Sequence, residues 1–149
     1  VSFPDADFVS EFGIEKFDAV TMWYVIEHFK NLDSVLKKVS EIVKDGGIFA
    51  FSTPSASGVS GKYSSEDFYE KSPSDHYTIW ETKCAKKILR KYGFKVVKVV
   101  STGIHPERFP LAKKMKWTSK SLPMKVLADL CKVLKLGDTF EVYCKKIKS

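Results

Sequence analysis

The sequence predicts an α/β fold built on a mostly parallel sheet. Four short apolar segments with strand character alternate along the chain with segments in which apolar residues recur at the helical period. A helix between successive strands is the connection that parallel strands need. The strand segments are 17–23, 48–54, 94–100 and 139–147.

The first strand and the helix after it have the clearest signals. Residues 17–23 alternate only weakly between apolar and polar, so we expect this strand to be buried on both faces. Asn31 is the expected N-cap of a helix over 31–44 with one apolar face. Asp45-Gly46-Gly47 is expected to end that helix, because glycine adopts the left-handed cap conformation easily. The apolar face consists of Leu32, Val35, Leu36, Val39, Ile42 and Val43.

The second half of the chain continues the alternation. A helical stripe that ends at Gly93 precedes the third strand. A last helix, opened by Ser121 and Pro123 and ended by Gly137, precedes the fourth strand. The residues expected on the buried side of this helix are Val126, Leu127, Leu130, Val133 and Leu134.

Two longer segments, 55–79 and 101–120, have no sustained period. We expect them to be irregular, apart from one turn of helix near 66–69, and we expect 55–79 to be less ordered than the strands. Loops of this length are usually functional. Both follow the carboxyl ends of strands, where parallel sheets bind their ligands. The two segments are therefore expected to form the rim of a binding site.

Length and composition predict one domain over residues 1–149. No run of about 18 apolar residues occurs, so we expect no segment that spans a membrane and no membrane partner. Residues 1–5 lack the features of a signal peptide. Three cysteines without metal-type spacing favour a reduced, cytoplasmic protein.

Charge is distributed unevenly. Residues 84–149 contain 17 Lys and Arg against 4 Asp and Glu, a net charge of +13 in a chain whose total is +7. Such asymmetry can indicate an anionic partner, but lysines also cover the solvated faces of helices whose other face is apolar. Only Lys113-Lys114-Met115-Lys116-Trp117 mixes basic residues with an aromatic one, so nucleic-acid binding remains a minor hypothesis.

Several short motifs occur in a fixed order along residues 1–102. They are Ala6-Asp7-Phe8, Phe17-Asp18, Glu27-His28, Lys44-Asp45-Gly46-Gly47, Thr53-Pro54-Ser55, His76 and Gly93-Phe94. In order and spacing they resemble class I S-adenosylmethionine-dependent methyltransferases, most closely the branch that contains the ubiquinone-pathway O-methyltransferases. The resemblance implies a Rossmann-like methyltransferase sheet with its last strand antiparallel beside the third. It also implies methyl transfer from S-adenosylmethionine to a small-molecule acceptor.

The resemblance also implies roles for four residues in cofactor binding. Asp7 would accept a hydrogen bond from the adenine amino group, and Phe8 would stack against the adenine. Met22 and Trp23 would lie against the sulfur-bearing end of the cofactor. The alternative for each is structural: a loop carboxylate for Asp7, and core side chains for the other three.

The resemblance begins at about the third strand of the family. The family holds its cofactor mainly through a glycine-rich turn after the first strand, and this sequence has no G-x-G. We therefore interpret residues 1–149 as the carboxyl-terminal part of a methyltransferase domain whose sheet is incomplete, lacking the first strands. The fragment alone is expected to be inactive and to bind S-adenosylmethionine poorly.

His76, at the end of the first long loop, is the candidate catalytic residue. It could act as the general base that takes a proton from the acceptor, and the alternative is that it anchors the loop. Some members of the family bind a metal through the counterparts of Glu27 and His28 and a glutamate three residues earlier. That position is Tyr24 here, which does not offer the anionic oxygen that Mg²⁺ prefers, so we predict no metal. Glu27 and His28 would instead pair with the next helix or hold the substrate loop.

Two other functions remain open at this point. The chain could be a non-catalytic interaction module that pairs with another chain through an exposed sheet edge. It could also bind nucleic acid through the basic 84–149 half, which would make binding steeply dependent on salt. Without the first strands, the edge of strand 17–23 lacks a partner, so we predict a homodimer through residues 17–23 or the helix 31–44.

Overall fold

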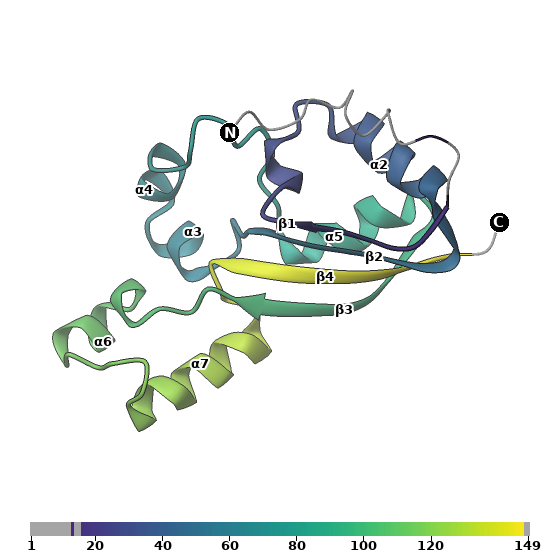
Figure 1. Ribbon diagram of the computed structural model, residues 1–149. Coiled ribbons are helices and arrows are strands. Elements are labelled where there is room, and N and C mark those ends of the chain that lie inside the picture. Colours follow the sequence, from purple (N-terminus) through teal and green to yellow (C-terminus); the bar gives the residue numbers. More distant parts are fainter. Residues whose placement is uncertain (1–12, 14–15, 148–149) are drawn as a thin grey trace.

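The computed structural model describes residue 13 and residues 16–147, which form an α/β fold with one four-stranded sheet (Figure 1). The strands are β1 (Phe17–Trp23), β2 (Val43–Pro54), β3 (Phe94–Thr102) and β4 (Thr139–Lys146), in the order β1-β2-β4-β3. β1 is parallel to β2, and β4 is antiparallel to both β2 and β3. The prediction of a mostly parallel sheet whose last strand is antiparallel beside the third is confirmed. The helices are η1 (Ile26–His28), α2 (Leu32–Ile42), α3 (Val59–Tyr63), α4 (Ser65–Glu70), α5 (Thr82–Arg90), η2 (Pro106–Arg108), α6 (Pro110–Lys114) and α7 (Leu122–Leu134).

The hydrophobic core lies between one face of the sheet and helices α2 and α5. Phe49 and Phe51 of β2 point to this face, and their rings pack against Phe94 and Trp80 respectively, at centroid distances of 5.5 and 5.1 Å. The apolar face of α2 is buried here, as its period predicts. Asn31 caps α2 by accepting a hydrogen bond from the Ser34 amide at 3.2 Å, which confirms the predicted N-cap.

No described helix covers the opposite face of the sheet over β1. Ala19, Thr21 and Trp23 alternate on that face, and all three are exposed. The prediction that strand 17–23 is buried on both faces is therefore wrong. Among the described residues β1 is an edge strand, and α2 and α5 cover only the face that carries Val20 and Met22.

The junction between α2 and β2 differs from the prediction by a few residues. The helix ends at Ile42, before the glycines, and β2 begins at Val43. Val43 is buried and pairs with Phe17 of β1, so its pairing and burial favour strand over another helical turn. Gly46 has a φ of 77° within the irregular first part of β2, where the register of the β1–β2 pair shifts.

The two segments expected to be irregular contain short helices. Residues 55–79 form α3 and α4, and the turn of helix expected near 66–69 lies within α4. In the other segment β3 continues to Thr102, and η2 and α6 follow it. Each of these helices spans six residues or fewer, which is too short for a recognisable apolar period.

The buried side of α7 is not the one that the sequence predicts. Met124 and Cys131 are each 2% exposed, whereas Val133 is 78% exposed. α7 packs beside β3 through the side that carries Met124 and Cys131, and Figure 1 shows α6 and α7 projecting from the β3 side of the sheet. The helix has apolar residues around most of its circumference, so its period did not identify the side that would pack. Of the predicted buried residues, Leu127 is half-buried and the exposed ones are Val126, Leu130, Val133 and Leu134.

No helix within the part of the chain that the structure describes is long and apolar enough to cross a membrane.

Candidate active site

A fixed turn at the carboxyl end of β1 positions the candidate site. Tyr24 adopts a left-handed conformation, with a φ of 55°. Its amide donates to the backbone oxygen and to the hydroxyl of Ser52, both at 3.1 Å, which ties the turn to the end of β2. Ile26 is fully buried and anchors η1, so the next two residues, Glu27 and His28, are presented where β1 and β2 end.

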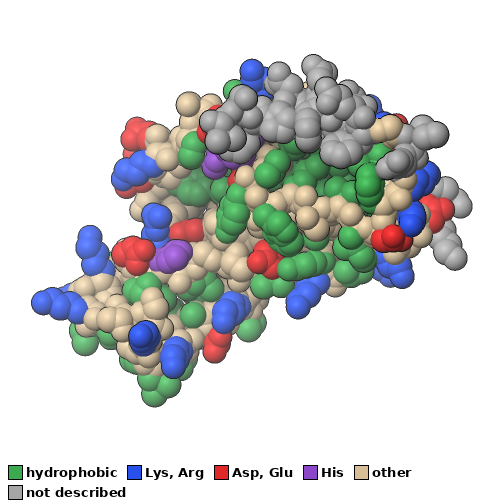
Figure 2. Space-filling view, viewed as in Figure 1, with side chains coloured by type: hydrophobic (Ala, Val, Ile, Leu, Met, Phe, Trp, Pro, Cys, Tyr) green, Lys and Arg blue, Asp and Glu red, His purple; other side chains and the backbone are tan. Residues whose placement is uncertain are grey.

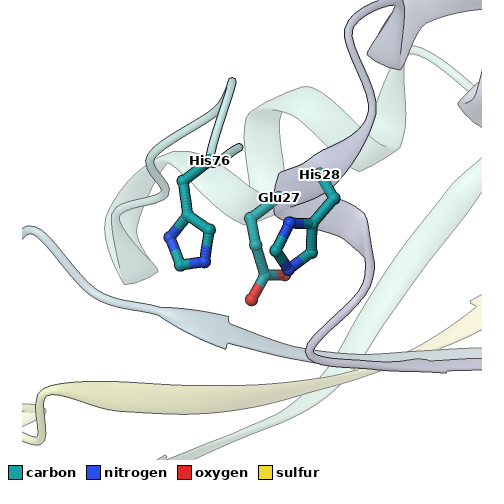
Figure 3. Close-up of side chains that lie close together, drawn as sticks. All are labelled: Glu27, His28 and His76. Atoms are coloured by element: carbon teal, nitrogen blue, oxygen red, sulfur yellow. The ribbon is translucent and has the colours of Figure 1, made fainter. Parts of the chain in front are cut away.

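Glu27, His28 and His76 form one cluster (Figure 3). The rings of His28 and His76 meet edge to face, with centroids 4.7 Å apart and an interplanar angle of 84°. One nitrogen or oxygen of each of the three side chains lies within 4.8 Å of the others. The structure thus brings His76, the predicted catalytic residue, next to the Glu27-His28 pair. His28 also contacts Asp75, which lies 47 positions further along the chain.

Glu27 and His28 hold the loop that carries His76. The backbone oxygen of Glu27 accepts hydrogen bonds from the amides of Tyr77 at 2.8 Å and Thr78 at 3.2 Å. Nδ1 of His28 lies 3.1 Å from the backbone oxygen of Asp75 and 3.2 Å from its carboxylate. Sequence reasoning missed Asp75. It belongs to no recognised motif, and its partner, His28 of η1, lies far upstream in the sequence.

Burial favours the neutral form of two members of the cluster, Glu27 and His76. Burial raises the pKa of the Glu27 carboxyl, and the neighbouring His28 and Thr53 only partly oppose that rise. The side chain is 1% exposed, and its Oε2 has no hydrogen-bond partner in the described part of the chain. Burial and the proximity of His28 lower the pKa of His76, while Asp75 opposes the change. The lowered pKa favours the neutral imidazole of His76, which is the form that accepts a proton.

We expect Glu27→Gln to stabilise the protein at pH 8 by about 1 kcal/mol, and by less at pH 4.5. A raised pKa in the folded state means that the unfolded chain releases the Glu27 proton first. Stability from the neutral carboxyl is thus complete below the ordinary pKa of 4.5 and is lost as the pH rises toward the folded value. Urea unfolding of both proteins at the two pH values measures the difference. The measured quantity is the stability of Glu27→Gln minus that of wild type. A lower value at pH 8 than at pH 4.5 would contradict a raised pKa of Glu27.

A cleft of about 790 Å³ lies beside the cluster, and His76 is the member of the cluster that lines it. Residues of α3 and α4 form one wall, and residues of η2 and α6 form the other. The two long segments predicted to form the rim of a site therefore face a common cleft. Arg108 contributes a cation to its wall, and Asp138 contributes a carboxylate.

Asp138 joins the two walls of the cleft. Its carboxylate accepts hydrogen bonds from the amide and the hydroxyl of Ser60, each at 2.7 Å. Nε of Arg108 lies 3.6 Å from the same carboxylate. Asp138 was missed in the sequence because it precedes the last strand, far in sequence from both partners. Asp138 therefore lines the cleft and also holds α3 in place through the amide of Ser60.

The predicted cofactor-binding residues are placed as follows. Met22 is half-buried and packs against the hydrophobic core, while Trp23 is 45% exposed on the open face, 6.2 Å from the ring of Tyr143. The two side chains point to opposite faces of the sheet, as neighbours in a strand must. Asp7 and Phe8 lie outside the described residues.

The described residues fit only part of an S-adenosylmethionine molecule. Trp23 offers an exposed aromatic surface at the tip of β1, on a face that no described helix covers. A glycine-rich turn that could hold the methionine and ribose portions is absent from the chain, which has eight glycines and no G-x-G. Gly46 and Gly47 lie at the opposite end of β2 from the tip of β1.

A metal ion is the other ligand that the cluster could hold. Glutamate with two histidines is a ligand set that suits zinc, and His76 is a possible third ligand beside Glu27 and His28. The prediction of no metal rests on Tyr24, which stands where metal-binding members of the family carry a glutamate.

We expect dialysis against EDTA to leave the methyl-transfer activity proposed below unchanged, because we predict no metal. The assay is run before and after dialysis, with metal content measured on the same samples. A loss of activity that added Zn²⁺ restores would contradict it.

Comparisons with known proteins identify the family. Residues 3–99 match the model of a family described as "Methyltransferase domain". No curated protein matches the chain. Among solved structures, similar ones include a SAM-dependent methyltransferase from Archaeoglobus fulgidus, at 19% identity and a TM-score of 0.62, over 95% of this chain and 64% of that one.

Two further structures have the same fold. One is a SAM-dependent methyltransferase, possible histamine N-methyltransferase, from Thermotoga maritima, at 18% identity and a TM-score of 0.61, over 89% of this chain and 57% of that one. The other is a Haemonchus contortus N-methyltransferase in complex with phosphomonomethylethanolamine and S-adenosylhomocysteine, at 17% identity and a TM-score of 0.55, over 95% and 36%. The chain thus spans less than two thirds of the length of these three structures. Its sequence match over residues 3–99, on a sheet of the expected topology, means that the chain belongs to the methyltransferase domain family.

Proposed function

We propose that the protein transfers a methyl group from S-adenosylmethionine to a small-molecule acceptor. The observation that supports this most strongly is the family match combined with a cleft lined by His76, the histidine held by Glu27 and His28. The acceptor would bind in the cleft between α3, α4 and α6, where Arg108 could contact an anionic group. The branch with the ubiquinone-pathway O-methyltransferases remains the subfamily that we propose, on the motifs given above.

In this proposal His76 is the general base. S-adenosylmethionine supplies an electrophilic methyl group when it is bound. The acceptor oxygen forms a bond to the methyl carbon, the carbon–sulfur bond breaks, and the acceptor proton passes to an imidazole nitrogen of His76. The lowered pKa of His76 favours the neutral imidazole, which can accept that proton. Positioning of the acceptor in the cleft supplies much of the acceleration, because methyl transfer needs an in-line approach.

We further propose that this chain is the substrate-side part of the enzyme and that the first strands of the sheet come from another segment. No described strand lies beside the outer edge of β1, no described helix covers its outer face, and the sequence has no G-x-G, all of which support this proposal. The similar solved structures are longer than this chain. The alignment with the Archaeoglobus fulgidus structure covers 95% of this chain but 64% of that one. The fragment alone would then be inactive.

The test is a transfer assay on the chain preceded by the residues encoded upstream of Val1. The protein is incubated with S-adenosylmethionine carrying a labelled methyl group and a fractionated small-molecule extract, and products are detected by label and mass. We expect one fraction to gain label in an enzyme-dependent way. Absence of label in every fraction, with cofactor binding intact, would contradict methyl transfer and favour an interaction module.

A second candidate, pairing with another copy of the chain, is supported by β1. Its outer edge has no strand beside it in the described part of the sheet, and Thr21 and Trp23 are exposed next to that edge. Of the two predicted surfaces, 17–23 is the better one. The apolar face of α2 is already buried against its own sheet, so the helix offers mainly polar side chains.

We therefore expect the chain to be a homodimer that Thr21→Lys weakens at least about tenfold, because a lysine beside an open edge opposes strand pairing. Sedimentation equilibrium at high micromolar concentration measures it. Ser34→Lys, an exposed position on α2, is the matched control and should remain a dimer. A wild-type monomer under these conditions would rule the dimer out.

A further inference from the structure

The α6–α7 lobe, residues 110–135, exposes an apolar stripe that the fold does not use. Met124 and Cys131 face the protein, and the apolar residues on the other side of α7 face outward. Leu122, at 74% exposed, and Val133, at 78%, lie on the same outward side at helical spacing. Seven large hydrophobic side chains of this lobe are exposed: Leu111, Met115, Leu122, Val126, Leu130, Val133 and Leu134. A patch of this kind usually marks an interaction site.

Lysines surround this stripe. The lobe contains seven lysines and one acidic residue, Asp129, so its net charge is +6. Asp129 is already engaged by Nζ of Lys132 at 2.9 Å. All seven lysines are exposed, and Figure 2 shows blue side chains around green ones over the projecting lobe. They are Lys113, Lys114, Lys116, Lys120, Lys125, Lys132 and Lys135.

We propose that the α6–α7 lobe docks on the surface of an anionic lipid membrane. A helix that is apolar on its outward side and flanked by lysines is the form that lies in a membrane interface, where the apolar side chains enter the acyl boundary and the lysines contact anionic headgroups. This proposal departs from the expectation of no membrane partner. That expectation rested on the lack of an apolar run long enough to span a bilayer, which interfacial docking does not require.

Other occupants fit this surface less well. A second copy would bring two surfaces of net charge +6 together, and the cores of protein interfaces are depleted in lysine. Nucleic acid would satisfy the lysines but not the five outward aliphatic residues of α7. An anionic bilayer satisfies both.

The lobe is also next to the cleft. Pro110 and Lys113 of α6 line the cleft together with His76. Docking would therefore hold the cleft beside a lipid surface. The docking surface does not depend on methyl transfer, and its test uses no cofactor or acceptor.

The test is co-sedimentation of the full chain with vesicles of phosphatidylcholine alone or mixed with phosphatidylglycerol. We expect at least about tenfold tighter binding to the mixed vesicles, weakening as salt is raised. Leu130→Gln/Val133→Gln should reduce binding to mixed vesicles at least about tenfold, and Lys114→Gln/Lys125→Gln should do the same. The matched controls are Val97→Gln on β3 and Lys86→Gln/Lys87→Gln on α5, which are exposed positions outside the lobe and should bind as wild type does.

A second readout locates the contact. Trp80 is buried, so in a Trp23→Phe variant the partly exposed indole is Trp117 of the lobe, and vesicles with brominated acyl chains should quench it. Equal binding to both vesicle types would overturn the proposal, as would equal losses in the lobe and control variants. Loss of self-association, and not of vesicle binding, in Leu130→Gln/Val133→Gln would overturn it in favour of a second copy. Displacement from the vesicles by duplex DNA, with the apolar variant unaffected, would overturn it in favour of nucleic acid.

Discussion

The His76→Gln variant is expected to lose methyl transfer by about 100-fold or more in kcat, because it removes the base that accepts the proton of the acceptor. Glutamine keeps a polar side chain beside His28 but cannot be protonated. The wild-type rate should fall on the acid side with a midpoint below 6.5, since burial and His28 lower the pKa of His76. The variant should lose that dependence on pH. Rates over a pH series, measured at saturating cofactor, give both quantities.

His105→Gln is the matched control for this prediction. His105 is 58% exposed, lies at the start of η2 and is not among the residues that line the cleft. Its substitution should leave kcat and the pH dependence unchanged. If His76→Gln retains the wild-type rate and the acid limb, His76 anchors the loop and is not the base. A rise in KM without a change in kcat would lead to the same conclusion.

The Gly137→Ala variant is expected to be destabilised by about 3 kcal/mol. A Cβ at this position would overlap the carbonyl oxygen of Thr102 and lie 2.7 Å from the hydroxyl of Ser101. The Gly137 amide donates to that hydroxyl at 2.7 Å, so the backbone cannot move away without losing a buried hydrogen bond. Asp138 follows directly, so the ties between the walls of the cleft would be disturbed as well.

Urea unfolding followed by circular dichroism measures this effect. Gly13→Ala is the matched control, because no atom of the described residues lies within 4 Å of the position of its added Cβ. The control should change stability by less than about 0.5 kcal/mol. Equal stability of Gly137→Ala and wild type would show that the segment before β4 is not packed against the end of β3 at Gly137 as described.

The sheet could be predicted because its strands and helices carry local signals. The stripe from Leu32 to Val43 has one apolar side, which α2 buries up to its last turn. The pattern at 17–23 was misleading, because a weak alternation indicates burial only if something covers both faces, and no described element covers one of them. For α7 the failure has a related cause. Its apolar residues occupy more than one side, so the period could not distinguish the side that carries Met124 from the side that carries Val133.

The candidate site could be predicted only in part. His76 was recognised from its place before a strand-like segment in the family pattern, and Glu27-His28 from its place after the first strand. Their contact could not be foreseen, because it depends on a loop that returns to η1 through the amides of Tyr77 and Thr78. Asp75 and Asp138 gave no local signal, since each acts through partners far away in sequence.

Equilibrium dialysis with labelled S-adenosylmethionine is the most direct test of the central claim, that this chain supplies the acceptor side of a methyltransferase. It is performed on residues 1–149 and on the same chain preceded by the residues encoded upstream of Val1. We expect the longer chain to bind at least about 100-fold more tightly, because it would add the cradle that the described residues lack, and we expect Trp23→Ala to weaken that binding. Equal binding by both chains would contradict the claim that part of the cofactor site lies outside residues 1–149. No binding by the longer chain would contradict methyl transfer itself.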